Sequence, residues 1–377
     1  MAACAAGTAV AALAACGGGS TVDSGGGGGA GAGAGGGGTA AQVRAGYVSA
    51  IDQIGLPIGV EGGHFEDQGL TVKLAQPFPT GVDLLNALQS GEVDVVQVGT
   101  PAIGAAQKGV DLVVLGNYTG SSTQRSIDET MAVVTRDASI KGDDLGTLRG
   151  KRIGVSIGSI NHLYLLGLLQ KAGLKTADVK IVNTGPPDMG VALQTGGIDA
   201  AVVWDPWPIT ITGQVQGARE VLRGGGYIPF IGYLVTTRAY AEKNPDVLER
   251  FLTARATVDQ WMRKNPDQAA EAATRWLPGT KADVARQAMR HNTKQLDPRM
   301  SVCNYLALDT IARMLAGQGA VKPGFDVGKY FRPGPILNVM AKRPALFDDL
   351  PRVPAGAEVK DGHQYERGAA ERACPAS

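Results

Sequence analysis

The chain has 377 residues, more than one ordinary hydrophobic core accommodates, and the length therefore predicts two lobes. Its 36 Lys and Arg residues nearly balance its 35 Asp and Glu residues, so the net charge of +1 provides no overall field for nucleic acid or an anionic membrane surface. The four cysteines include no Cys-x-x-Cys pair, and the four histidines are scattered without metal-ligand spacing. We therefore expect no metal site, no cofactor and no nucleic-acid partner.

The first 16 residues have the features of an export signal. Residues 5–15 are small and apolar, and the motif from Leu13 to Cys16 is similar to the lipobox of bacterial lipoproteins, in which a lipid is attached to the cysteine after cleavage. This resemblance implies a lipid anchor on Cys16, export, and a location in the periplasm or at the outer face of the cell membrane. The alternative is an Ala- and Gly-rich leader with a chance cysteine, since no Lys or Arg precedes the apolar run.

Residues 17–40 are dominated by glycine and are predicted to form a flexible linker. A Gly-rich chain of 24 residues has an end-to-end distance of about 25–30 Å. That length would hold a folded domain just above a bilayer and leave it free to turn.

Strands and helices alternate from residue 41 onward, which predicts an α/β fold with parallel sheets and crossover helices. Apolar runs bounded by turn residues predict strands at residues 43–50, 70–76, 94–99, 111–118, 151–158, 179–185 and 199–206. Segments with helical periodicity follow at residues 81–91, 101–109, 159–173 and 188–197. After about residue 240 the chain is mostly helical.

Two segments that look alike bracket the middle third of the chain. Residues 130–139 and 232–241 each run from an apolar strand through Thr-Arg to a polar exit. They would serve as hinge strands between a discontinuous first lobe and an inserted second lobe, and the alternative is two unrelated edge strands. We accordingly expect the first lobe in residues 41–132, the second lobe in 133–232, a return to the first lobe with the C-terminal helices in 233–344, and a tail in 345–377.

Four segments carry a resemblance to a known family: ALQSGEVDVVQVGTPAI, LRGKRIGVSIGSINHLYLLGLLQKAGL, VKIVNTGPPDMGVALQTGGIDAAVVWDPW and YLVTTRAYAEKNPDVLERFL. In this order and spacing they resemble the taurine/nitrate/sulfonate-binding family of ABC solute-binding proteins, in particular its taurine and aliphatic-sulfonate branch. The resemblance covers roughly residues 42–320. It implies a periplasmic-binding-protein-like fold, with two α/β lobes joined by two hinge strands around a ligand cleft. It also implies delivery of a small anionic solute to the transmembrane subunits of an ABC permease.

Strand ends that lead directly into helices are the expected ligand-binding positions of an α/β fold. Gly99 and Thr100 follow one strand, and Gly158, Ser159 and Asn161 follow another. Free N–H groups at the helix starts, together with the hydroxyls of Thr100 and Ser159, would bind an anion such as a sulfonate. The alternative is that both hydroxyls only cap their helices. The family resemblance favours the anion site.

His162 and Asn117 are further candidates for ligand contact. Relatives in the taurine branch also carry a histidine at the position of His162, although a lone histidine near a helix start is often a packing group. Asn117 and Tyr118 end another strand and would reach the cleft, unless they belong to an ordinary turn.

A positively charged end of the solute would need a carboxylate. Glu129 begins the first hinge strand, where taurine-branch relatives also carry an acid, and Asp205 lies in the motif WDPW. A buried carboxylate is costly unless it is paired, and an ammonium group would pair it, with Trp204 as a cation–π wall. The alternatives are a solvated hinge charge for Glu129 and a turn-forming role for Asp205.

We expect a binding protein and not an enzyme, because the sequence contains no GxSxG, HExxH or P-loop motif. The expected solute is a sulfonate such as taurine or an alkanesulfonate, and the alternatives are nitrate, an aromatic sulfonate or a pyrimidine precursor. An enzyme similar to the thiamin pyrimidine synthases is the alternative from another class. The cysteine-rich motif of those enzymes is missing, since no cysteine lies between Cys16 and Cys303.

Cys303 and Cys374 are the cysteines that remain after removal of the leader and acylation of Cys16. In an oxidising compartment they would pair and pin the C-terminal tail to the helical region. The alternative is two free thiols, since Cys374 lies in a segment with the composition of a mobile tail.

Overall fold

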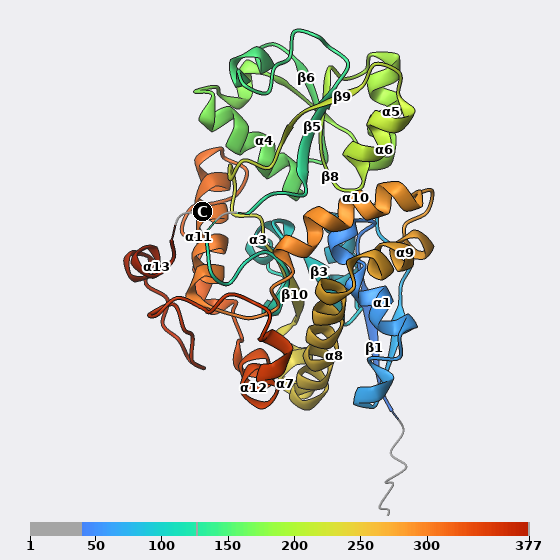
Figure 1. Cartoon of the computed structure of the whole chain (residues 1–377). Helices are drawn as coiled ribbons and strands as arrows, with labels where there is room; N and C mark the ends of the chain where they lie inside the picture. Colours follow the sequence, from blue (N-terminus) through green and yellow to red (C-terminus); the bar gives the residue numbers. More distant parts are fainter. Residues whose placement is uncertain (1–39, 126, 376–377) are drawn as a thin grey trace, which may run out of the picture. The chain divides into compact units, whose positions relative to one another are not determined.

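The computed structural model describes residues 40–125 and 127–375, which form two lobes, each built on a five-stranded sheet (Figure 1). The strands of the first lobe are β1 (Ala41–Gly46), β2 (Leu70–Leu74), β3 (Val95–Val98), β4 (Leu112–Thr119) and β10 (Gly232–Thr237). Those of the second lobe are β5 (Met131–Thr135), β6 (Arg152–Val155), β7 (Lys180–Asn183), β8 (Ala200–Trp204) and β9 (Arg219–Arg223). The predicted signal peptide and its Cys16 lie outside the described residues.

The two sheets have the same strand order, β2-β1-β3-β10-β4 in the first lobe and β7-β6-β8-β5-β9 in the second. In each sheet the fourth strand, β10 or β5, is antiparallel to both of its neighbours. These two strands are the ones that the chain forms on arriving from the other lobe. The two segments that look alike in the sequence therefore occupy equivalent places in the two sheets. Because β5 and β10 are antiparallel to their neighbours, both sheets are mixed, whereas the alternation of strands and helices predicted parallel sheets.

The central strands are apolar because helices cover the sheets. Every residue of β3, β5 and β8 is buried. The edge strand β7, with the sequence KIVN, exposes both of its ends. Continuous apolar runs are typical of strands that are covered on both faces, whereas a polar edge discourages pairing with another chain.

Helices pack around both sheets and between the lobes. Those of the second lobe are α4 (Ile160–Lys171), α5 (Pro186–Thr195) and α6 (Trp207–Gln214). Those of the first lobe are α1 (Gly55–Glu61), α2 (Gly81–Ser90), α3 (Pro101–Gln107), α7 (Arg238–Lys243), α8 (Pro245–Lys264), α9 (Pro266–Trp276), α10 (Ala282–Asn292), α11 (Val302–Gly317), α12 (Gly334–Lys342) and α13 (Arg367–Ala373). α4 is apolar nearly all round because it lies on its own sheet and also contacts α11.

Two segments without helix or strand, residues 120–125 with 127–130 and residues 224–231, carry the chain between the lobes. The buried carboxylate of Asp128 in the first segment accepts hydrogen bonds from the N–H groups of Gly226 and Tyr227, at 2.8 Å each, and of Ile228 at 3.3 Å. The two segments are thereby tied to each other beside the cleft.

The C-terminal segment, which the sequence suggested to be a tail, is packed against the first lobe. Cys303 at the start of α11 and Cys374 after α13 form a disulfide with their Cα atoms 5.6 Å apart, and both cysteines are buried. The N–H of Val302 also donates to the carbonyl oxygen of Ala357 at 2.8 Å. The chain is thus fastened back onto α11 at two points.

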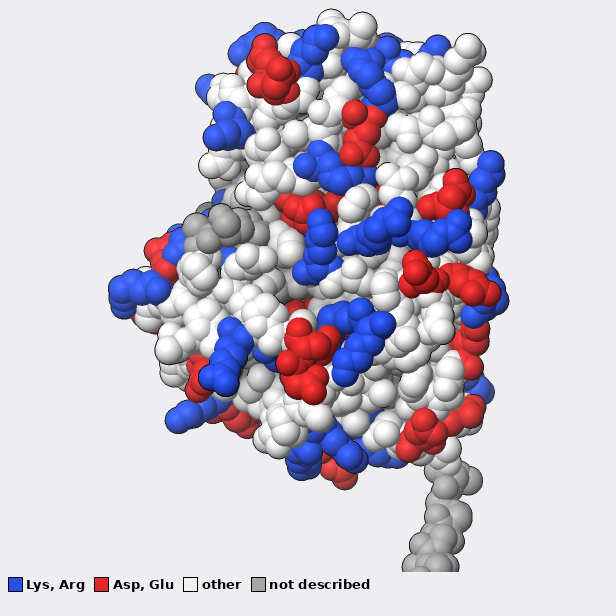
Figure 2. Space-filling view, in the orientation of Figure 1, with Lys and Arg blue, Asp and Glu red and all other residues white. Residues whose placement is uncertain are grey.

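Charged side chains of both signs are interspersed on the face of the molecule shown in Figure 2. No large area of one sign lies on that face, in keeping with the net charge of +1. Long-range steering of an ion to this face is therefore weak. Within the part of the chain that the structure describes, no helix combines the length and the apolar character needed to cross a membrane.

Candidate ligand-binding site

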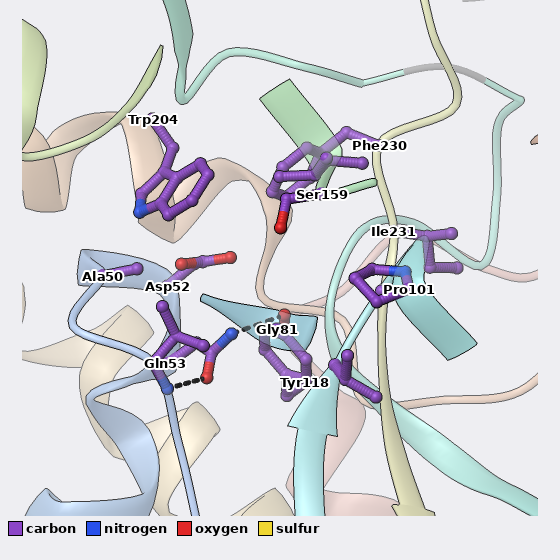
Figure 3. Close-up of a pocket in the computed structure, with 14 residues that line it drawn as sticks. Ala50, Asp52, Gln53, Gly81, Pro101, Tyr118, Ser159, Trp204, Phe230 and Ile231 are labelled. Atoms are coloured by element: carbon purple, nitrogen blue, oxygen red, sulfur yellow. Dashed lines mark hydrogen bonds between the residues drawn. The ribbon is translucent and has the colours of Figure 1, made fainter. Parts of the chain in front are cut away.

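A pocket opens between the two lobes, where strands from both sheets end (Figure 3). It contains about 440 Å³ of space not filled by atoms, part of it open to solvent. We call it the cleft pocket. The residues that line it are Val48, Ala50, Asp52, Gln53, Gly81, Val98, Gly99, Pro101, Tyr118, Ser159, Ile160, Trp204, Phe230 and Ile231.

Ser159 belongs to the second-lobe wall, at the start of α4. It is 3% exposed, and its hydroxyl has no hydrogen-bond partner among the described residues. Ser159 occupies the N-cap position, but its side chain makes no capping hydrogen bond. The structure therefore disfavours the capping role that the sequence left open, and the hydroxyl remains available to a group in the pocket.

The loop before α4 turns the start of this helix toward the cleft. Gly158 has a φ of 86°, a left-handed conformation that favours glycine. Its N–H donates to Nδ1 of His162 at 3.3 Å, so this N–H is already used. The N–H groups of Ile160 and Asn161 open a 12-residue helix and have no partner within it. The positive end of a helix dipole thus lies at the pocket wall.

The second predicted anion-binding position lies at the start of α3, which has seven residues. Gly99 lines the cleft pocket, and a Cβ on it would lie 2.9 Å from the carbonyl oxygen of Ile231, so only glycine fits there. Thr100 is buried, and its hydroxyl neither caps α3 nor has another partner in the described chain. It lines an adjoining cavity together with Gly158 and His162. The predicted loops therefore lie between two neighbouring cavities.

Asp52 is the acidic residue of the cleft pocket, and it comes from the short 3-10 turn Ile51–Gln53 after β1. It is 5% exposed, and burial is the main cause that raises the pKa of its carboxyl to about 7, with a smaller contribution from the charge of Asp205. The neighbouring Gln53 is fixed by two hydrogen bonds, from the N–H of Val48 at 2.6 Å and to the hydroxyl of Tyr118 at 3.0 Å.

The two carboxylates that the sequence proposed as ammonium ligands have partners from the chain. Asp205 is buried outside the pocket lining, where one of its oxygens lies 2.8 Å from the guanidinium of Arg223 and 2.7 Å from Nδ1 of His291. The other oxygen is buried without a partner in the described residues. The side chain of Glu129 is 41% exposed and lies 3.7 Å from the ammonium group of Lys294. Neither carboxylate lines the cleft pocket.

The remaining predicted residues are distributed between the pocket and the core. Trp204 lines the cleft pocket, and its indole N–H is buried without a partner in the described chain. Asn117 and Asn161 are buried outside the lining, where their side-chain amides donate to the carbonyl oxygens of Arg299 at 2.5 Å and Val202 at 3.0 Å. Burial lowers the pKa of His162, which favours its neutral form beside the start of α4.

Sequence reasoning did not single out Asp52, Gln53 or Phe230, and of the strand-end pair Asn117 and Tyr118 it is Tyr118 that lines the pocket. Asp52 and Gln53 lie in the segment between β1 and α1, so the rule that selected the segment around Ser159, between a strand and its helix, also applies to them. Phe230 lies in the second crossing segment, for which the sequence contains no comparable signal. Within residues 40–125 and 127–375, no group of three His, Cys, Asp or Glu side chains is placed to hold a metal ion.

Comparison with known proteins identifies relatives that are named binding proteins. The chain is 32% identical to the putative aliphatic sulfonates-binding protein of Escherichia coli (strain K12) over 205 residues, and 31% identical to the taurine-binding periplasmic protein of the same organism over 207 residues. These alignments span 53% and 54% of this chain. They cover 61% of each of the two relatives, less than two thirds of their length.

A solved structure with the same fold is the alkanesulfonate-binding protein from Xanthomonas axonopodis pv. citri bound to MOPS. It superimposes with a TM-score of 0.69 at 22% identity, over 78% of this chain and 98% of that one. The two-lobed α/β fold expected from the sequence is confirmed by this agreement. The model of the NMT1-like family matches residues 36–277, which is more than half of the chain. The chain therefore belongs to the NMT1-like family.

Proposed function

We propose that this chain is the solute-binding component of an ABC importer, which captures a small anionic solute and presents it to the permease. A sulfonate such as taurine or an alkanesulfonate is the solute that we favour. The observation that carries the proposal is the buried, unpartnered hydroxyl of Ser159 at the start of α4, on the wall of a pocket between two lobes. The names of the two Escherichia coli relatives support a sulfonate, and so does MOPS, which carries a sulfonate group, in the structural neighbour.

The energetics of the α4 start favour an anion. A helix N-terminus stabilises a negative charge by about 0.3–1 kcal/mol at the surface and by up to about 2 kcal/mol when partly buried. A buried hydroxyl without a partner costs about 1–3 kcal/mol, which a sulfonate oxygen would offset by accepting its hydrogen bond. Both contributions act at the same wall, so an anion placed there needs no Arg or Lys from the pocket.

Replacing Ser159 by alanine should weaken sulfonate binding and leave the fold intact. Hydrogen bonds to charged groups contribute about 1.5–3 kcal/mol, so Ser159→Ala should lower affinity about 10- to 100-fold. Because Ser159 does not cap α4 and its buried hydroxyl has no partner in the described chain, the free energy of unfolding should not fall and should rise by up to about 1–3 kcal/mol. Calorimetric titration with taurine and propanesulfonate measures the affinity, and urea unfolding measures the stability.

Ser301 provides a matched control, because it is the N-cap of α11 and its hydroxyl accepts a hydrogen bond from the N–H of Cys303 at 3.1 Å. Ser301→Ala should cost about 1 kcal/mol of stability and leave affinity unchanged, the reverse of Ser159→Ala. The anion site would be wrong if Ser159→Ala bound sulfonates as well as the wild type. Binding of nitrate, an arylsulfonate or a pyrimidine with no response to sulfonates would contradict the proposed solute.

We also propose that the protein is exported and held at the membrane by a lipid on Cys16, which lies outside the described residues. The motif from Leu13 to Cys16 supports this proposal. Mass spectrometry of protein extracted from membranes of the expressing bacterium should identify Cys16 as a lipidated N-terminus. An unmodified peptide that runs through Ala15, Cys16 and Gly17 in the exported protein would contradict it.

A further inference from the structure

The carboxylate best placed to meet a positive charge in the cleft pocket is Asp52, which belongs to the first lobe. Asp205 is held by Arg223 and His291 outside the lining, and Glu129 lies exposed beside Lys294. Asp52 lines the pocket and is nine-tenths buried. Apart from its own backbone N–H, no group of the described chain hydrogen-bonds to its carboxyl oxygens.

Asp52 and Ser159 face the same space from different lobes. In Figure 3 the carboxyl group of Asp52 and the hydroxyl of Ser159 are directed toward each other across the pocket, with the ring of Trp204 to one side. The side chain of Gln53 is occupied by Val48 and Tyr118, so it does not neutralise the acid. A group that fills the space between Asp52 and Ser159 contacts a carboxyl at one end and a hydroxyl with a helix start at the other.

The charges around Asp52 leave it without a cation from the protein. Its turn packs against α10 and β4. The titratable groups on that side are Tyr118 of β4, His291 of α10, and Asp205, and both His291 and Arg223 contact Asp205. The buried Arg255, whose charge acts on Tyr118, is paired with Asp259 at 2.9 Å. Among the described residues, no Lys, Arg or His side chain lines the cleft pocket. An ionised carboxylate in such a place is costly unless its partner comes from outside the chain.

We propose that Asp52 binds the ammonium end of the solute, so that the preferred ligand is a zwitterion whose anionic end lies at Ser159 and the start of α4. This inference rests on the proposed function and specifies the solute class within it. An aminosulfonate would touch both lobes at once, through Asp52 of the first and Ser159 of the second. A plain alkanesulfonate would instead place an apolar end against a buried carboxylate.

The proposal predicts opposite pH responses for two isosteric ligands. Taurine and propanesulfonate differ by an ammonium in place of a terminal methyl group, and the ammonium stays protonated over the neutral range. The pKa of about 7 for Asp52 in the ligand-free protein means that the carboxyl gains a proton as pH falls below 7. Taurine should then lose affinity, approaching tenfold per pH unit, because its partner is neutralised. Propanesulfonate should keep or gain affinity, because the negative charge beside its methyl end disappears.

The test is calorimetric titration of the full folded protein with both ligands at about pH 5.5, 7 and 8.5, in the wild type and in Asp52→Asn. The asparagine keeps the shape of the side chain and removes its charge. We expect Asp52→Asn to lose at least about 10-fold in taurine affinity at the highest pH, to retain propanesulfonate binding, and to lose the pH dependence for both ligands. Glu129→Gln is the matched control, since it removes an exposed carboxylate at the edge of the lobes, and it should change neither ligand.

Three results would overturn the inference while leaving the proposed function standing: equal taurine affinity in Asp52→Asn and wild type, an equal loss of taurine and propanesulfonate, or an unchanged pH slope in Asp52→Asn. The last would mean that a group other than Asp52 carries the pH dependence. If neither ligand binds the wild type at any pH, the proposed function itself fails. Thermal unfolding of each variant shows whether it is folded. If Asp52→Asn does not fold, Asp52→Ser takes its place in the same comparison.

Discussion

At the scale of single residues, the buried polar groups fall into two sets. Asn161 and Gln53 are hydrogen-bonded by the chain itself, and they fix the backbone on which the pocket is built. Ser159 and Trp204 are equally buried, but their polar side-chain atoms line the pocket without a partner from the described chain, and the buried carboxyl of Asp52 has its own backbone N–H as its sole partner there. Each such group costs about 1–3 kcal/mol in the ligand-free state. The ligand-free protein bears this cost, and a bound ligand would offset it. For this reason we take these three residues as markers of the ligand site.

The residues that sequence reasoning brought to the pocket are those at clear strand ends. Trp204 ends β8, Gly99 follows β3 directly, and Ser159 lies in the loop between β6 and α4, and each of these strands has an unambiguous apolar run. Asp52 was overlooked because the first strand was expected to continue to residue 50, and the short turn that follows it was given no role. On β4 the sequence offered both Asn117 and Tyr118, and Tyr118 is the one that lines the pocket, since successive side chains point to opposite faces and a sequence alone does not fix which face meets the cleft.

At the scale of elements, the disulfide between Cys303 and Cys374 joins α11 to the segment after α13 across a separation of 71 residues. Replacing both cysteines by serine should lower the free energy of unfolding by about 2–4 kcal/mol, because the cross-link restricts the unfolded chain. Urea unfolding under oxidising conditions measures this change. Solute affinity should be unaffected, since neither cysteine lines the cleft pocket.

Wild-type protein unfolded in the presence of a reductant serves as the control for the double serine variant. Both samples lack the cross-link, so their unfolding midpoints should coincide. Two free thiols in the unreduced, denatured wild type would contradict the pairing, as would equal stability of the variant and the oxidised wild type.

Elements with strong periodicity were predictable from the sequence, but the directions of β5 and β10, the strands that follow the two crossings, were not. The alternation of apolar runs with helices follows from local pattern, and most of the resulting strands and helices are present in the structure. Whether β5 and β10 run parallel or antiparallel to their neighbours depends on how the segments before them, residues 120–125 with 127–130 and residues 224–231, cross between the lobes. The hydrogen bonds of Asp128 that join those crossings link residues about 100 apart, and no local pattern carries that information.

At the scale of the whole molecule, a small set of contacts joins the lobes next to the pocket. The carbonyl oxygen of Asp205 accepts a hydrogen bond from the N–H of Ile51 at 3.2 Å, and the indole N–H of Trp207 donates to the carbonyl oxygen of Ser49 at 3.3 Å. The side chain of Asp205 meets His291 of the first lobe at 2.7 Å. A separation of the lobes would break these contacts, so they would add to whatever a solute contributes by touching both walls.

Replacing Asp205 by asparagine should therefore weaken all solutes by the same factor. The variant loses the charge that holds His291 of the first lobe, which would favour an open arrangement of the lobes and reduce the closed fraction before any solute binds. A loss of about 1.5–3 kcal/mol from these contacts corresponds to about 10- to 100-fold lower affinity for taurine and for propanesulfonate alike. Small-angle scattering should give a larger radius of gyration for the ligand-free variant than for the ligand-free wild type.

Glu220→Gln is the control for this prediction, because Glu220 contacts the same Arg223 at 2.6 Å but belongs, like Arg223, to β9 of the second lobe. It should alter local charge without changing closure, affinity or the radius of gyration. A selective loss of taurine in Asp205→Asn would contradict a role in closure and would mean that Asp205 contacts the ammonium group itself. The two acids are thus separable by experiment: charge removal at Asp52 should discriminate between the isosteric ligands, whereas charge removal at Asp205 should shift both equally, because it acts on the equilibrium between open and closed lobes.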